Sequence, residues 1–300
     1  MVTAGSDEFR YLNDIASKRG LPAPLMPVVR VHSPMIGGSV SALQWGTSSP
    51  RLVFLHGLGQ NAHTFDTVAL TLHEPLLSVD LPGHGWSSAT PPTMVTLDDV
   101  ARGLCEALAP LRQSPAVLVG MSLGGLCALA LAQRTPSWWS HLVLLDCTPS
   151  ITPDKARTVT DFLDGPTSFD SIDDMLIRTI AFNPTRSPES LARGVALNAR
   201  EREDGRWVWH HQAHETRLRP QFNAEQLWHT LSDLPLPVSL LHGTRGDSAV
   251  GVRDIEHFCS RRPGDRVRAV EGAGHALQGE APEAVAAYLD LVLRASTQDR

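Results

Sequence analysis

The chain has 300 residues, 42% of them hydrophobic and 19% charged, a balance that suits one large globular domain or one domain with an insertion. Its formal net charge of -6 gives no basic surface for nucleic acid or for anionic lipid. No apolar run approaches the roughly 18–20 residues of a membrane span. The acidic N-terminal segment differs from a secretory signal, and the four cysteines are widely spaced. We therefore expect a cytoplasmic protein that binds neither nucleic acid nor membranes.

Short β-rich runs alternate with helix-like stretches through the first half of the chain, the pattern of a mostly parallel sheet covered by helices on both faces. The strands expected there, in order, are 28–31, 40–45, 51–56, 76–80, 116–121 and 141–146. The helices expected between them begin near residue 62, span 97–108, and follow the strand at 116–121 as far as Pro136.

The alternation stops after Asp146 and resumes near residue 235. Strands are expected at 237–242 and 266–270, and a last helix at 282–294. The sequence thus predicts a doubly wound α/β core, formed by residues 28–149 and 235–300, with a helical cap inserted at 150–234. Residues 1–27 exceed what this core needs, so we expect them to cover the core or to contact a second subunit in a homodimer.

A G-x-S-x-G motif is centred on Ser122, between an expected buried strand and an expected helix. A serine on such a sharp turn has a strained backbone, and the flanking glycines relieve the crowding. The turn presents the hydroxyl at the carboxyl edge of the sheet, beside a helix N-terminus that favours developing negative charge. Ser122 is therefore the expected nucleophile.

A serine hydroxyl needs a base to take its proton, and His275 is the expected base. Of the 13 histidines, it lies in a glycine-lined loop between the last strand and the last helix. A loop at the carboxyl end of a strand can bring the imidazole over the serine. His56 and His84 also follow strands, but we expect them to brace loops.

Two carboxylates are candidates for holding the imidazole in the correct tautomer. Asp146 directly follows the strand before the cap, and Asp247 lies in a glycine-bearing loop after the next strand. We prefer Asp146 because it directly follows its strand, which fixes its position more closely than a loop would. Asp247 remains the alternative. The oxyanion donors are expected to be the backbone N–H groups of Leu123 and of Leu58, with Gly57 as the alternative to Leu58.

These motifs resemble those of the α/β-hydrolase superfamily over about residues 28–296. The matching segments are HGLG at 56–59, DLPGHGWS at 80–87, GMSLGG at 120–125, LLDCTP at 144–149 and GAGHALQGEAP at 272–282. The resemblance implies the α/β-hydrolase fold with its cap, and the serine, aspartate, histidine order of that family. It implies no cofactor.

Members of the superfamily differ in where the acid lies. Most have it after the strand that follows the cap, in a G-x-x-D pattern, but the segment from Gly243 to Asp247 is one residue too long for that. Some members, including zearalenone lactone hydrolases, have the acid at the end of the strand before the cap, which is where Asp146 lies. The resemblance thus also favours Asp146.

The resemblance also suggests a substrate class. A serine nucleophile argues against haloalkane dehalogenases and epoxide hydrolases, which have aspartate there. Carbon–carbon bond hydrolases usually have a tryptophan after the histidine, whereas Ala276 follows His275 here. We therefore expect hydrolysis of a small-molecule ester or lactone, with carbon–carbon hydrolysis or another acyl transfer as the alternative. A non-catalytic small-molecule receptor on the same fold is the alternative of a different class.

The predicted cap contains two groups of residues of interest. Its three tryptophans are candidates for the wall of a pocket for an apolar, aromatic or macrocyclic substrate such as a zearalenone-like lactone, although packing of the cap explains them equally well: Trp207, Trp209 and Trp228. Three histidines have spacings that allow metal ligands: His210, His211 and His214. They lack evident carboxylate partners, so we expect a solvated face and no metal site.

Overall fold

The computed structural model describes residues 8–21, 26–88, 94, 96–211 and 221–298. Its centre is an eight-stranded sheet with the strand order β1-β2-β4-β3-β5-β6-β9-β10. The strands are β1 (Val28–Met35), β2 (Gly38–Trp45), β3 (Leu52–Leu55), β4 (Leu76–Val79), β5 (Ala116–Met121), β6 (Trp139–Leu145), β9 (Val238–Gly243) and β10 (Arg266–Val270). β2 pairs antiparallel with β1 and β4, and every other pairing in the sheet is parallel.

The central strands consist almost entirely of apolar residues because helices cover both faces of the sheet. Every residue of β3, β4 and β5 is buried. Side chains of alternate residues enter two separate cores: Leu118 faces one and Val119 the other. Continuous apolar runs of this kind are typical of parallel strands buried on both faces.

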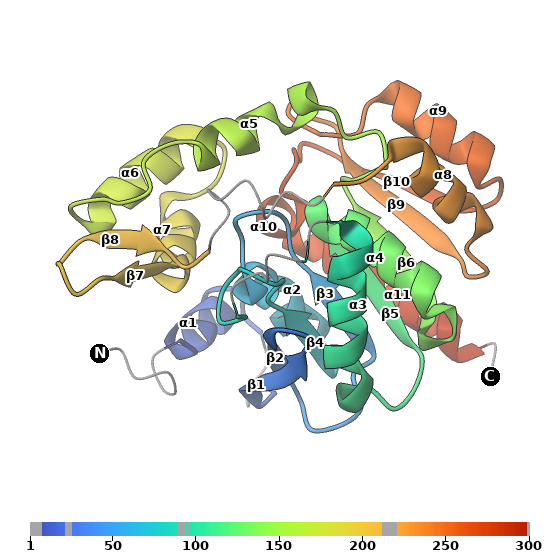
Figure 1. Cartoon of the computed structure of the whole chain (residues 1–300), viewed down its shortest axis with the longest axis horizontal. Helices are drawn as coiled ribbons and strands as arrows, with labels where there is room; N and C mark the ends of the chain where they lie inside the picture. Colours follow the sequence, from blue (N-terminus) through green and yellow to red (C-terminus); the bar gives the residue numbers. More distant parts are fainter. Residues whose placement is uncertain (1–7, 22–25, 89–93, 95, 212–220, 299–300) are drawn as a thin grey trace.

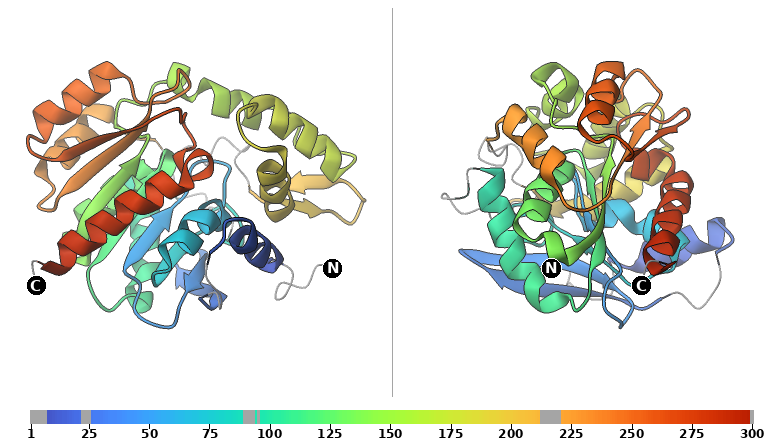
Figure 2. Two further views of the ribbon diagram at one scale, coloured as in Figure 1. Left: turned by 180° about the vertical axis from the view of Figure 1, so that it is seen from behind. Right: turned by 90° about the vertical axis from the view of Figure 1, so that its right-hand side faces the viewer.

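Two sets of helices form the outer layers (Figures 1 and 2). One face carries α3 (Leu97–Leu108), α4 (Leu123–Arg134), α8 (Ala224–Asp233) and α9 (Val252–Arg261). The other face, seen from behind in Figure 2, carries α1 (Arg10–Lys18), α2 (Asp66–Leu72), α10 (Leu277–Glu280) and α11 (Pro282–Gln298). Short 3-10 turns occur at η1 (Ala62–Phe65), η2 (Ala109–Leu111) and η3 (Pro136–Trp138).

A separate group of elements connects β6 to α8 and extends to one side of the sheet (Figure 1). It comprises α5 (Pro153–Leu163), α6 (Ile172–Phe182), α7 (Pro188–Asn198), β7 (Ala199–Glu201) and β8 (Trp207–Trp209). β7 and β8 form an antiparallel hairpin that the sequence analysis did not predict. We call this group, residues 153–209, the cap.

Helix α8 differs from the prediction, which included it in the cap. It packs against α4 and α9, and Trp228 on α8 is 2% exposed within the core of that face. The Trp228 indole N–H donates to Ser150 Oγ (3.0 Å), and its ring stacks on His257. Trp228 therefore packs in the core. It is not a wall of a substrate pocket, which corrects the prediction from the sequence.

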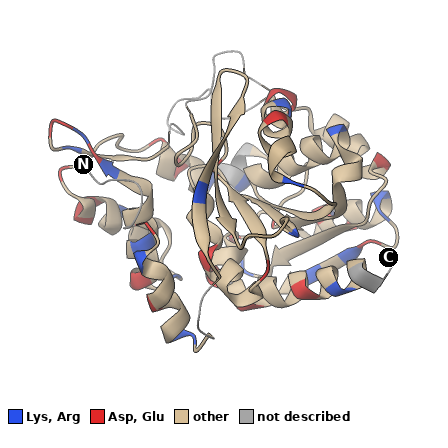
Figure 3. Cartoon of the chain, turned by 90° about the horizontal axis from the view of Figure 1, so that it is seen from below, with Lys and Arg blue, Asp and Glu red and all other residues tan. Residues whose placement is uncertain are grey.

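Helix α1, which lies within the predicted leader, covers part of the core. Its Leu12 and Ile15 are buried against the same apolar cluster as α2 and α11. Among the described residues no helix combines the length and the apolar character needed to cross a membrane. Lys/Arg and Asp/Glu residues are interspersed along the helices in the view from below (Figure 3).

Candidate active site

Ser122 occupies a sharp turn between β5 and α4. Its φ of 52° and ψ of -119° are unusual for a residue with a side chain, and such a backbone costs on the order of 1–3 kcal/mol. The flanking glycines make the turn possible. A Cβ at Gly120 would lie 2.4 Å from the carbonyl oxygen of Gly124, and one at Gly124 would lie 2.1 Å from that of Leu55. The turn therefore places the hydroxyl at the carboxyl edge of the sheet.

Three side chains predicted as site residues lie in one hydrogen-bonded series at this edge. His275 Nε2 is 3.1 Å from Ser122 Oγ, and His275 Nδ1 is 2.8 Å from Asp146 Oδ2. Because a carboxylate only accepts, Nδ1 carries the proton and Nε2 is left as the acceptor for the serine hydroxyl. The arrangement can thus take a proton from Ser122.

The Asp146 carboxylate is fully buried and held from several directions. Its Oδ1 accepts from the Gly243 N–H (3.0 Å) and the Ser248 hydroxyl (2.5 Å), while Oδ2 also accepts from the Ala249 N–H (2.7 Å). Hydrogen bonds of this number fix the orientation of the carboxylate. The end of β9 and the segment after it therefore supply donors to an acid that lies before the cap.

Asp247, the alternative acid, makes different contacts. Arg245 donates to both of its oxygens, from Nε to Oδ1 (2.7 Å) and from Nη2 to Oδ2 (2.6 Å), and this pairing lowers the pKa of Asp247. Arg245 also forms an ion pair with Glu280 (2.7 Å), which accepts from the Gly274 N–H (2.9 Å). Asp247 and Glu280 thus brace the loop before His275, and the structure brings Asp146 to the imidazole.

The backbone N–H groups of Leu123 and Leu58 are available as oxyanion donors. Leu123 is the first residue of α4, where an N–H has no intrahelical acceptor. In the other turn, the Gly57 N–H donates to Gln60 Oε1 (3.1 Å) and the Gly59 N–H to His84 Nε2 (3.0 Å). Because the Gly57 and Gly59 N–H groups already have acceptors, Leu58, which lies between them, is favoured over Gly57 as the second donor.

Two buried histidines brace the segment 56–61, which we call the oxyanion turn. His84 accepts from Gly59 through Nε2 and donates from Nδ1 to the Pro82 carbonyl (3.1 Å). His56 accepts from the Leu81 N–H (3.0 Å) and donates to the carbonyl of Gly57 (2.8 Å). Burial lowers the pKa of both imidazoles, that of His84 well below its ordinary value, so both remain neutral.

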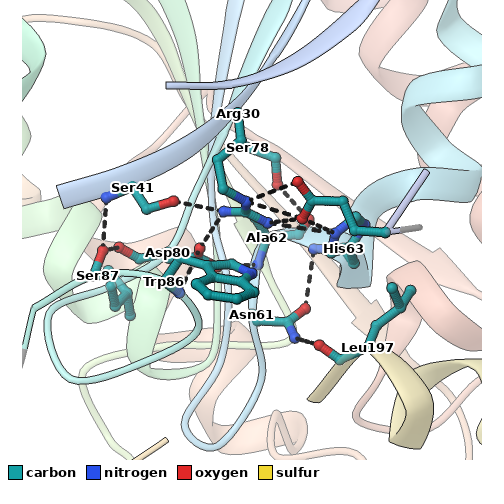
Figure 4. A network of polar contacts seen from close by, with 12 residues as sticks. Arg30, Ser41, Asn61, Ala62, His63, Ser78, Asp80, Trp86, Ser87 and Leu197 are labelled. Carbon is teal, nitrogen blue, oxygen red and sulfur yellow. Dashed lines mark hydrogen bonds and ion pairs between the residues drawn. The ribbon is translucent and has the colours of Figure 1, made fainter. Parts of the chain in front are cut away.

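A buried ionic network lies beside the same turn (Figure 4). Arg30 donates to Asp80 Oδ2 (2.7 Å) and Glu8 Oε2 (2.8 Å), and Asp80 Oδ1 accepts from the Ala62 N–H (2.7 Å). Burial lowers the pKa of His63, but the Asp66 and Glu8 carboxylates outweigh this effect and raise it to about 9. The network thereby ties β1, the end of β4 and η1 together beside the oxyanion turn. Sequence analysis did not detect it, because its members are far apart in the chain and, apart from Asp80 in the segment DLPGHGWS, lie outside the matched motifs.

The cap is hydrogen-bonded directly to the oxyanion turn. Asn198 at the end of α7 donates from Nδ2 to the Gly59 carbonyl (2.8 Å). In the opposite direction, Asn61 Nδ2 donates to the Leu197 carbonyl (2.8 Å), as Figure 4 shows. The cap therefore holds both sides of the turn that carries Leu58.

A cavity of about 770 Å³ lies between the cap and the core, next to the oxyanion turn. Leu58 and Gln60 line it on the core side, and Phe162, Leu163 and Trp209 on the cap side. Trp207 is not among its lining residues and packs with Phe169 and Met175. Of the three tryptophans named from the sequence, Trp209 is thus the one placed on the cavity wall.

The histidines at 210 and 211, which the sequence analysis included in the predicted cap, do not form the expected solvated face. His211 is 5% exposed and its ring stacks on Trp209, while His210 is half-buried with its ring edge-on to Trp86. Both pack against neighbouring aromatic rings, which the spacing in the sequence could not reveal. His214 lies outside the described residues. Within those residues no group of three or more His, Cys, Asp or Glu side chains is suited to a metal ion.

Comparison with known proteins identifies the family. The model of the "Alpha/beta hydrolase family" matches residues 52–288, which include all three members of the series. The chain belongs to the alpha/beta hydrolase family. The esterase Rv0045c of Mycobacterium tuberculosis is 39% identical over 294 residues, covering 94% of each chain. A pimeloyl-[acyl-carrier protein] methyl ester esterase of Aromatoleum aromaticum is 32% identical over 264 residues, covering 82% of this chain and 98% of that protein.

Solved structures agree with this assignment. A structure of the Rv0045c esterase matches with a TM-score of 0.85 and 37% sequence identity, over 97% of this chain and all of the other. The structure of E-2-(acetamidomethylene)succinate hydrolase matches with a TM-score of 0.77 at 22% identity, over 88% of this chain and 98% of the other, a likeness of fold alone. The expected fold, an α/β-hydrolase with a doubly wound, mostly parallel sheet, is confirmed.

Proposed function

We propose that this alpha/beta hydrolase is a serine esterase that forms an acyl-enzyme on Ser122. The observation that carries the proposal is the series from Asp146 through His275 to Ser122, with contacts of 2.8 and 3.1 Å. The likeness to the mycobacterial esterase, over nearly the whole of both chains, supports ester hydrolysis as the reaction.

In the acylation step, His275 Nε2 takes the proton of the Ser122 hydroxyl as its oxygen attacks the ester carbonyl carbon. The carbonyl electrons move to oxygen, and the N–H groups of Leu58 and Leu123 stabilise the resulting oxyanion. When the tetrahedral intermediate collapses, the alkoxide leaves and receives the proton from His275. Asp146 stays ionised and stabilises the imidazolium through its bond to Nδ1.

In the deacylation step, His275 takes a proton from a water molecule, whose oxygen attacks the acyl carbonyl. The same two N–H groups stabilise the second oxyanion. Collapse expels Ser122, which recovers its proton from His275, and the carboxylic acid product departs. A lactone would follow the same steps, except that its alcohol remains attached to the acyl group.

The cavity bears on the choice among ester substrates. Its cap wall is aromatic and apolar at Phe162, Leu163 and Trp209, but α1 and α7 contribute charged side chains such as Lys18 and Arg193. A wholly apolar macrocyclic lactone would fit this charged wall less well than a substrate that also has polar groups. We therefore propose a carboxylic ester with an apolar part near the oxyanion turn.

Turnover of p-nitrophenyl butyrate by the wild type, Ser122→Ala and Ser260→Ala tests the proposal. Ser260 is exposed on α9, so it serves as a matched control. We expect Ser122→Ala to lose at least about a thousandfold in kcat/KM and Ser260→Ala to match the wild type. Full activity of Ser122→Ala would refute the proposal. A wild type that binds esters but turns none over would favour the non-catalytic receptor.

A further inference from the structure

The cavity is lined by more cationic than anionic side chains, several of them on or next to α1 and α7. Figure 1 shows these two helices on the same side of the molecule. The cations that line the cavity are Lys18, Arg19, Arg186, Arg193 and Arg245, and the carboxylates are Glu189, Glu280 and Glu283. Among the Lys, Arg, Asp and Glu side chains, the lining therefore has two more positive than negative groups; His63, which also lines it, is paired with Asp66 and Glu8.

Three of the cations have carboxylate partners. The ion pairs are Lys18 with Glu189, Arg19 with Glu283, and Arg245 with Glu280, the last pair at 2.7 Å. Arg245 is also shared with Asp247 outside the cavity. These pairs account for every carboxylate of the lining, so the excess positive charge belongs to Arg186 and Arg193.

Neither Arg186 nor Arg193 has a carboxylate within 4.0 Å in the described part of the chain. Arg186 donates from Nη2 to Ser190 Oγ (3.1 Å), and its Nε is buried without a hydrogen-bond partner among the described residues. Burial lowers the pKa of its guanidinium, the Glu280 carboxylate opposes this effect, and Arg193 adds to it. A buried guanidinium N–H without an acceptor is unfavourable, so a ligand oxygen that accepts from Arg186 would stabilise the site.

Contacts in α10 place Arg186 close to the oxyanion turn. Its guanidinium lies over Gly279, where a Cβ would be 2.8 Å from Arg186 Cζ. The preceding residue, Gln278, donates to Gln60 Oε1 (3.3 Å), and the same oxygen accepts from the Gly57 N–H. A ligand that extends from Leu58 along the cavity past Gln60 therefore reaches Arg186.

We propose that Arg186 and Arg193 bind an anionic group, a carboxylate or a phosphate, carried by the substrate at the end remote from its ester. Both groups have oxygens that accept paired hydrogen bonds from a guanidinium. The inference rests on the proposed esterase function, because it names the class of ester. The preferred substrates are esters whose acyl chain ends in a negative charge.

Three p-nitrophenyl esters of equal acyl length test this inference, one ending in a carboxylate, one in a phosphate monoester and one in a neutral methyl ester. Several chain lengths are compared. We expect the wild type to show kcat/KM at least about tenfold higher for an anionic ester than for the neutral one at the best length. The better of the two anions identifies the group. Equal values for all three esters would overturn the inference while leaving the esterase proposal intact.

Substitutions of the two arginines test whether they cause the preference for anionic esters. Arg186→Gln and Arg193→Gln should lower the ratio of anionic to neutral kcat/KM towards one, and Arg186→Lys should keep part of it. Arg253→Gln is the control, because Arg253 is exposed on α9 and does not line the cavity. A ratio unchanged in both glutamine variants would overturn the assignment.

Binding without turnover separates the two proposals. The thermal midpoint is measured with and without millimolar dicarboxylate or alkyl phosphate of the best length. A shift in the wild type that disappears in Arg186→Gln supports the anion site even if no ester is hydrolysed, a result that would refute only the esterase. Equal shifts in the wild type and in Arg186→Gln would overturn the anion site.

Discussion

Asp146 and His275 are 129 residues apart in the chain, yet Asp146 Oδ2 lies 2.8 Å from His275 Nδ1. Each follows a parallel strand directly or after a short loop, at the same edge of the sheet. The carboxylate follows the strand before the cap, but the N–H groups that hold it come from the last residue of β9, Gly243, and from Ala249 in the segment after β9. Two loops thus cooperate to orient one imidazole.

Replacing the two candidate acids should have very different effects. Asp146→Asn places an amide against His275 Nδ1 and favours the wrong tautomer, so we expect kcat/KM for a neutral ester to fall by about 10³–10⁴-fold. Asp247→Asn should lower it only a few-fold, by loosening the loop before His275. Steady-state kinetics of both variants, with thermal melts to confirm folding, measure this. Losses of similar size would contradict the assignment of the acid.

The bond between the cap and the oxyanion turn should affect the chemical step. Asn198→Ala removes the donor to the Gly59 carbonyl, so we expect a several-fold lower kcat with KM nearly unchanged. Asn183→Ala is the matched control, because Asn183 donates to the Thr179 carbonyl within the cap. Kinetics with a short neutral ester compare the two. The same kcat in both variants would show that the cap does not position the turn.

His63 should make stability depend on alkaline pH. Its pKa is raised from the ordinary histidine value of 6.5 to about 9 in the folded chain, so protonated His63 contributes stability that is full below about pH 6.5. That contribution, on the order of 3 kcal/mol, is lost as the pH rises through about 9. Thermal midpoints between pH 6 and 9.5 should therefore fall more steeply for the wild type than for His63→Gln. His229→Gln, at an exposed histidine on α8, should follow the wild type, and parallel curves for His63→Gln would disprove the linkage.

Two glycine substitutions should change stability in opposite directions. Gly124→Ala would place a Cβ 2.1 Å from the Leu55 carbonyl oxygen, so we expect a loss of roughly 1–3 kcal/mol in the free energy of unfolding. Gly194→Ala lies within α7 with nothing inside 4 Å of the new Cβ, and should gain about 0.5–1 kcal/mol. Urea denaturation measures both. A stable Gly124→Ala would mean that the elbow does not require its glycine.

The strands and the positions of Ser122, Asp146 and His275 were predictable because they depend on local patterns. A buried apolar run before a G-x-S-x-G turn fixes β5 and the elbow, and the strand-end position places Asp146 at the sheet edge. The structure bears out the helix at Leu97–Leu108 and the strand at Arg266–Val270 residue for residue. These elements are governed by caps, periodicity and burial, which the sequence displays directly.

Other features depend on tertiary contacts that no local pattern displays. The sequence analysis did not anticipate α1, α9, α10 or the β7–β8 hairpin as separate elements. Trp228 and Trp209 both lie in the predicted cap and the sequence does not distinguish them. In the structure α8 packs on the core, which buries Trp228. Likewise, Arg186 becomes conspicuous only where the fold leaves its Nε without a partner among the described residues.

Covalent labelling tests the central claim, that Ser122 is the activated nucleophile, most directly. The purified wild type is treated with a fluorophosphonate, and intact mass and peptide mapping locate the adduct. We expect one adduct, on the peptide that contains Ser122, and none on Ser122→Ala. Labelling at another serine, or an unlabelled wild type that is fully folded, would contradict the account.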